Sequence, residues 1–113
     1  MSKYDLKRFL DAQDNNYQIA LSEVSSGRKR THWMWFIFPQ ILGLGFSAMS
    51  RHYAIRDLDE AKCYLEHKVL GNRLVEISNI LLSLQTNNAA DVFGTPDDMK
   101  LYSSMTLFTQ VCN

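Results

Sequence analysis

The sequence lacks an excess of charge of either sign and has few cysteines. Among its 113 residues, 12 lysines and arginines balance 12 aspartates and glutamates. A neutral chain has no general electrostatic attraction to nucleic acids or anionic membranes, although a local basic patch is compatible with neutrality. Cys63 and Cys112 lie far apart and do not indicate a secreted disulfide scaffold. We therefore expect no general nucleic-acid binding and no membrane partner.

The sequence also lacks long apolar runs. The first eight residues have no apolar core of a signal peptide, and the longest apolar run, residues 33–38, is far too short to cross a membrane. We expect a location in the cytoplasm of a bacterium or another reducing cytoplasm. The length and the apolar fraction of 46% are typical of one globular domain, which we predict to span residues 1–113.

The most informative stretch is residues 27–40, which read Gly-Arg-Lys-Arg-Thr-His-Trp-Met-Trp-Phe-Ile-Phe-Pro-Gln. Its six consecutive apolar residues fit a buried strand or a buried helix equally well by periodicity. No other stretch has the pattern of a partner strand, and a lone strand cannot satisfy its backbone hydrogen bonds. We therefore predict a short buried helix over residues 33–38, which Pro39 ends.

Apolar residues at helical spacing predict further helices around this segment. The longest runs from Leu70 to Leu84. Asp57 and Glu60 have the spacing of a capping box, and Thr95-Pro96 followed by two aspartates predicts a helix capped by Thr95. Residues 89–94 are interpreted as a brief apolar turn. The predicted fold class is all-α, a single compact domain of about six or seven short helices packed around a buried Trp-rich helix.

Two motifs resemble known sites and are interpreted as structural. Gly43, Gly45 and Ala48 match the dinucleotide-binding fingerprint, but the strand, crossover helix and second strand that the fingerprint requires are missing. Cys63 and His67 lie four apart on a predicted helix, yet two ligands do not form a metal site. We predict no cofactor and no metal.

The candidate ligand site is the basic end of the Trp-rich segment. If Thr31 caps the helix, then free backbone N–H groups, cations and the imidazole of His32 meet at one point, as in sites for phosphate or carboxylate. Trp33 or Trp35 could add a stacking face for a base. The structural alternative is a solvated basic loop beside tryptophans that only fill the core. The predicted ligand-binding residues are Arg28, Lys29, Arg30, His32, Trp33 and Gln40.

Three functions follow from this site. The first is a binding module for a small anionic or nucleotide-like ligand at residues 28–33. The second is an enzyme acting on such a ligand with His32 as acid/base, because imidazole titrates near neutral pH. The third is a protein–protein adaptor whose aromatic core is only structural. No catalytic residue can be assigned from spacing.

The predicted C-terminal helix carries apolar residues over an arc too wide for one contact face. Large apolar side chains left in water are unusual on a monomer, and a symmetric contact between two copies would cover them. We therefore expect a homodimer through Leu107, Phe108 and Val111.

Several of these motifs, in this order, resemble a known family. The stretch 27–40 is followed by Gly-Leu-Gly-Phe-Ser, Tyr-Ala-Ile, Tyr-Leu-Glu-His, Leu-Gly-Asn-Arg-Leu and Lys-Leu-Tyr-Ser-Ser-Met-Thr-Leu-Phe. From about Leu6 to Phe108 the chain resembles the bacterial family catalogued as domain of unknown function 1810. The resemblance implies a mainly helical fold and no established activity, substrate or cofactor. Lys68 stands where we expect a proline in this family. The family usually continues past the last of these motifs into a further helical segment, whereas this sequence stops at Asn113, so we expect it to lack that segment.

Overall fold

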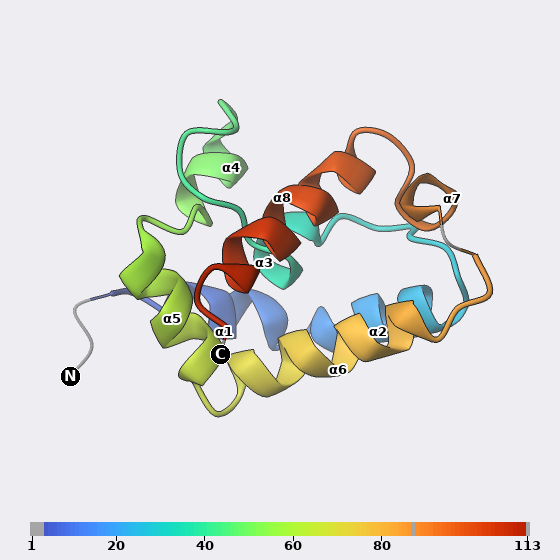
Figure 1. Cartoon of the computed structure of the whole chain (residues 1–113), viewed down its shortest axis with the longest axis horizontal. Coiled ribbons are helices and arrows are strands. Elements are labelled where there is room, and N and C mark those ends of the chain that lie inside the picture. Colours follow the sequence, from blue (N-terminus) through green and yellow to red (C-terminus); the bar gives the residue numbers. More distant parts are fainter. Residues whose placement is uncertain (1–3, 87, 113) are drawn as a thin grey trace.

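Eight helices make up the regular structure of the part of the chain that the computed structural model describes, residues 4–86 and 88–112 (Figure 1). Their bounds are α1 (Lys7–Gln13), α2 (Tyr17–Ser25), α3 (Met34–Ile37), α4 (Ala48–His52), α5 (Leu58–Glu66), α6 (Leu70–Leu82), α7 (Ala89–Phe93) and α8 (Asp97–Thr109).

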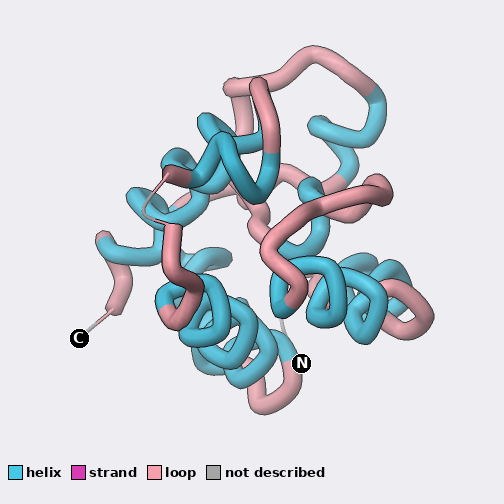
Figure 2. Tube along the Cα trace, turned by 90° about the vertical axis from the view of Figure 1, so that its right-hand side faces the viewer, coloured by secondary structure: helices cyan, strands magenta, loops and turns pink. Residues whose placement is uncertain are grey.

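The β structure of the same residues is a single isolated bridge between Ile41 and Ile55, and Figure 2 shows only helices and loops. The all-α prediction is confirmed. Gly43, with a φ of 104°, lies in the loop between α3 and α4, and no strand of the described residues leads into it, in agreement with the structural interpretation of the dinucleotide-binding fingerprint. Within the described ranges, no helix is long and apolar enough to span a membrane.

Helix α3 is the centre of the core, as its sequence predicts. It lies against α1 on one side and α8 on the other. Trp33 and Phe38, which flank it, are buried, and the ring of Phe93 from α7 lies about edge-on to both at 6.1 and 5.9 Å. Edge-to-face aromatic pairs at this spacing add roughly 0.5–1.5 kcal/mol each beyond burial. Trp35 is only half-buried.

Two local predictions were wrong. Residues 89–93 form helix α7 and not a turn, because the side chain of Asn88 accepts a hydrogen bond from Ala90 N at 3.0 Å and caps its start. Helix α8 begins with Pro96 at the N-cap, and Thr95 does not cap it. The carboxylate of Asp97, the first residue of α8, forms ion pairs with Lys29 at 2.9 Å and with Lys100 of the same helix at 3.2 Å.

The expected dimer surface is largely buried within the subunit. Leu107 and Phe108 belong to the core, and the Phe108 ring lies 5.3 Å from that of Tyr64. The apolar arc of α8 is wide, as predicted, but α3, α5 and α7 cover it from different sides. Leu107 and Phe108 therefore expose little of their surface, and only Val111 of the three is half-buried. A homodimer stays a prediction.

Candidate anion-binding site

The predicted site lies in the loop between α2 and α3, and an internal carboxylate occupies its donors. Trp33, and not Thr31, is the N-cap residue of α3. Glu23 of α2 accepts hydrogen bonds from the backbone N–H groups of Arg30 (2.7 Å) and Thr31 (3.0 Å), from Thr31 Oγ1 (2.8 Å) and from Trp33 Nε1 (2.9 Å). Backbone donors of this loop therefore hold the protein's own anion.

The charge of Glu23 is strongly favoured by these bonds. Partial desolvation opposes ionisation, but the hydrogen bonds from Arg30, Thr31 and Trp33 outweigh it and lower the pKa of Glu23 to about 2. A carboxylate that accepts several hydrogen bonds is stabilised in its charged form. Glu23 is therefore ionised throughout the neutral range and neutralises part of this basic segment.

The structure does not bring the predicted ligand-binding residues together around one cavity. Lys29 Nζ pairs with Asp97 at 2.9 Å and lies 5.2 Å from the ring of the buried Trp33. Arg28 and His32 are exposed. Arg30 borders an open cavity of about 540 Å³ that neither Arg28 nor His32 lines.

Gln40, the last of the predicted residues, has a structural backbone role. Its carbonyl accepts a hydrogen bond from Ile55 N at 2.8 Å, next to the isolated bridge. Gln40 is half-buried and does not line the cavity that Arg30 borders.

A second basic cluster surrounds a cavity of about 270 Å³ between the start of α1, the end of α4 and the loop that leads to α5. Three arginines and a histidine line it, with one carboxylate side chain among them. The lining residues are Asp5, Arg8, Leu42, Arg51, His52, Ala54 and Arg56. We call this space the arginine cavity.

The side chain of Arg8 forms part of the wall of the arginine cavity and is held in place by hydrogen bonds. Its guanidinium donates to the carbonyls of His52 (2.8 Å) and Ala54 (2.9 Å), to the Asp5 carbonyl, and to Glu60 Oε2 (3.0 Å). Glu60 is 0% exposed. A buried charge needs a partner and further hydrogen bonds, and Glu60 has both, because its other oxygen accepts from Arg56 N at 2.7 Å.

Asp57 Oδ1 accepts from Glu60 N at 2.9 Å, so Asp57 caps α5 as predicted. The Glu60 carboxylate accepts hydrogen bonds from Arg56 N and from Arg8. Together these bonds hold the backbone of the cavity wall in one arrangement.

Arg51 and Arg56 supply the available positive charge. Both are exposed, and neither guanidinium forms an ion pair or side-chain hydrogen bond with the residues that the structure describes. Since Glu60 balances Arg8, the two arginines against Asp5 leave a net charge of about +1 before His52 is counted. Guanidinium groups match carboxylate and phosphate oxygens in a bidentate geometry.

The sequence pattern did not reveal this cluster, because its cations come from three separate segments. The local signal was weak: Arg51-His52 and Arg56 flank a short apolar stretch that includes the buried Ile55. Only the contacts between Arg8 and the carbonyls of residues 52 and 54 bring α1 beside them.

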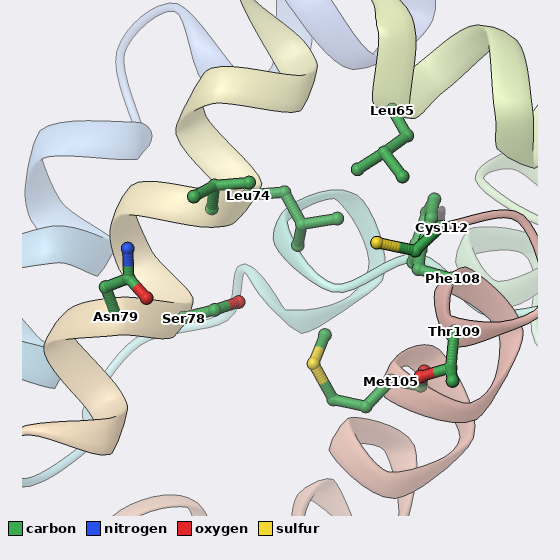
Figure 3. A pocket seen from close by; sticks show the side chains of 9 residues that line it. Leu65, Leu74, Ser78, Asn79, Met105, Phe108, Thr109 and Cys112 are labelled. Carbon is green, nitrogen blue, oxygen red and sulfur yellow. The ribbon is translucent and has the colours of Figure 1, made fainter.

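A further cavity, of about 220 Å³ between α5, α6 and α8, has no charged side chain in its wall (Figure 3). The side chains of Leu65 and Leu74 and the sulfurs of Met105 and Cys112 point into it.

His67, which the sequence analysis considered as a metal ligand together with Cys63, accepts hydrogen bonds through Nδ1 from Val69 N (3.1 Å) and Leu70 N (3.3 Å). His67 therefore supports the start of α6.

The fold and the arginine cavity define a class: a small all-α domain with a preformed, positively charged surface cavity. The chain belongs to the family described as protein of unknown function (DUF1810), whose model matches residues 3–113. This confirms the resemblance seen in the sequence motifs.

One solved structure is similar, that of the conserved hypothetical protein Rv1873 from Mycobacterium tuberculosis. It shares 47% identity and superposes with a TM-score of 0.96, covering 98% of this chain and 79% of that one. No curated protein matches the chain.

Proposed function

We propose that this protein is a binding module for a small anionic ligand, and that the ligand binds in the arginine cavity and not at residues 28–33. One observation carries the proposal. Two exposed guanidinium groups with no carboxylate partner, those of Arg51 and Arg56, line a cavity whose third arginine is already fixed by Glu60. Such a site binds an anion without having to break an internal ion pair first.

The volume of the cavity limits the ligand. At about 270 Å³ it is smaller than the roughly 300–1,000 Å³ of pockets that enclose drug-sized molecules. The chemistry of the lining favours phosphate or carboxylate groups. The ligand is therefore a small phosphate ester or polycarboxylate, or the charged end of a larger molecule that extends into solvent.

Residues 28–33 are the weaker location. Lys29 is paired with Asp97 and Trp33 is buried, so Arg28, Arg30 and His32 remain from the predicted set. The enzyme alternative named His32 as acid/base. His32 is exposed, and no described titratable group is hydrogen-bonded to it, so no observation favours that alternative.

The test is a thermal-shift and calorimetric titration with inorganic phosphate, citrate and AMP. A ligand that binds the native state raises the melting temperature. We expect at least one probe to bind, and the R51Q/R56Q variant to weaken it by roughly tenfold or more, since charged hydrogen bonds are lost.

The matched control is R28Q/R30Q, which removes the same charge from the other basic segment and should leave binding unchanged. Loss of binding in R28Q/R30Q but not in R51Q/R56Q would show that the anion binds at residues 28–33 and not in the arginine cavity. Failure of all three probes to bind would overturn the proposal.

A further inference from the structure

Beside the arginine cavity, large apolar side chains are unusually exposed. In the loop before α4, Leu42 is 54%, Leu44 55% and Phe46 84% exposed. Figure 1 shows this loop and α4 at the periphery of the molecule, away from α2 and α6. Scattered exposed apolar residues are ordinary, but several within five residues form a patch of the kind that marks an interaction surface.

An apolar groove of about 500 Å³ runs between this loop, α8 and the start of α5. None of its lining side chains is charged: they are Ile41, Leu44, Leu58, Tyr102, Ser103, Thr106, Leu107 and Gln110. Leu58 is half exposed, and Tyr102 is 77% exposed, so the groove is open to a partner.

The groove and the arginine cavity are neighbours on the two sides of the isolated bridge. Ile41 lines the groove, and the next residue, Leu42, lines the arginine cavity. Leu42 N donates to Ile55 O at 2.8 Å, which holds this segment extended against residue 55. In an extended chain successive side chains point to opposite faces. Arg56 also lines the arginine cavity, and Leu58, the first residue of α5, lines the groove.

We propose that these two sites together bind a polypeptide segment of a partner protein, in which an acidic side chain lies a few residues from a large apolar one. The carboxylate pairs with Arg51 and Arg56, and the apolar side chain fills the groove beside Leu44 and Tyr102. Because an extended chain advances about 3.3 Å per residue, a segment of three to five residues spans roughly 10–17 Å.

Charge complementarity selects this occupant. A purely apolar partner would cover the groove but leave two guanidinium groups beside it without a counter-charge, which specific interfaces avoid. A small anion would satisfy the arginines but leave the exposed apolar loop uncovered. This inference rests on the proposed function only for the binding of the acidic side chain in the arginine cavity; the binding of the apolar side chain in the groove is independent of it.

The test is a selection of phage-displayed random peptides on the wild-type protein, followed by anisotropy titrations of the enriched peptides with a fluorescent label. We expect enriched sequences to combine an acidic residue with a large apolar one nearby. R51Q/R56Q and, separately, Leu44→Ser should each weaken their binding by roughly tenfold, as loss of an anchor at an interface does.

The controls are R28Q/R30Q and Leu82→Ser, which change exposed residues elsewhere on the molecule, and both should bind as the wild type does. Leu44 is exposed, so Leu44→Ser should fold; inorganic phosphate binding by this variant would show that the arginine cavity is intact. If phosphate binds through Arg51 and Arg56 but no acidic peptide is enriched, the proposed function stands and this inference is wrong.

The inference would also be overturned if the enriched peptides lacked acidic residues, or if Leu44→Ser bound them as tightly as the wild type does. A wild-type dimer in sedimentation that Leu44→Ser dissociates would show that a second copy covers the groove, and would contradict it equally.

Discussion

Replacing Glu23 by glutamine tests whether one carboxylate organises the loop between α2 and α3. The substitution keeps the size of the side chain and removes its charge. The amide has one acceptor oxygen for the backbone N–H groups of Arg30 and Thr31, the Thr31 hydroxyl and the indole of Trp33, which all bond the carboxylate. The three N–H groups bond Oε1, which the amide keeps without its charge, while the Thr31 hydroxyl loses the oxygen to which it donates and must accept from the amide NH2 instead.

The size of the effect follows from the lowered pKa. A decrease from 4.5 to about 2 corresponds, at about 1.4 kcal/mol per pKa unit, to a ceiling of about 3.5 kcal/mol. Glu23 is partly exposed, and solvent screens its interactions, so we expect about half of this ceiling, roughly 1.5–2 kcal/mol, at pH 7. Charged hydrogen bonds have net contributions of the same order.

The pH dependence gives the sharper test. A group whose pKa is lowered on folding contributes its full stability above its unfolded pKa of 4.5 and loses it as the pH falls through about 2. The difference between wild type and Glu23→Gln should therefore be full at pH 7 and fall to about 0.4 of that value at pH 3.

Urea unfolding followed by tryptophan fluorescence measures the difference at both pH values. Glu66→Gln, at an exposed glutamate near the end of α5, is the control and should show no such change. An equal difference at pH 7 and pH 3, or none at pH 7, would refute the role assigned to Glu23.

Two further substitutions test the packing of the fold by the same unfolding assay. Arg8→Ala leaves the carboxylate of Glu60 buried without its partner, and we expect a loss of about 3–5 kcal/mol in the free energy of unfolding. Gly71→Ala places a Cβ 1.9 Å from the carbonyl oxygen of Leu65, a contact that only a backbone shift can relieve. We expect a loss of about 3 kcal/mol or more.

The controls for these two variants are Lys7→Ala and Asn72→Ala, at exposed neighbouring positions of the same helices. Both should unfold close to the wild type. An Arg8→Ala variant as stable as Lys7→Ala would show that the Glu60 pair is dispensable. A stable Gly71→Ala variant would show that α5 and α6 can separate at no cost.

The sequence by itself determined the helical architecture. Apolar residues at helical spacing located α6 and α8, because one stripe of each helix must be buried against the rest. The Trp-rich segment had no partner strand, and that absence alone indicated a buried helix, which α3 confirms. The cap at Asp57 was also readable, because the hydrogen bond spans only three residues.

The tertiary structure decided where charge is available. Arg28, Lys29 and Arg30 are the densest cations in the sequence, but Glu23 and Asp97 offset them through contacts that no local pattern specifies.

In the arginine cavity, Arg8 reaches carbonyls 44 and 46 residues away, so its cations become neighbours only after α1 packs beside the end of α4. Local periodicity is set by contacts within a few residues and can be read from a sequence. A binding site depends on which distant side chains neutralise one another, and that is fixed only when the helices pack.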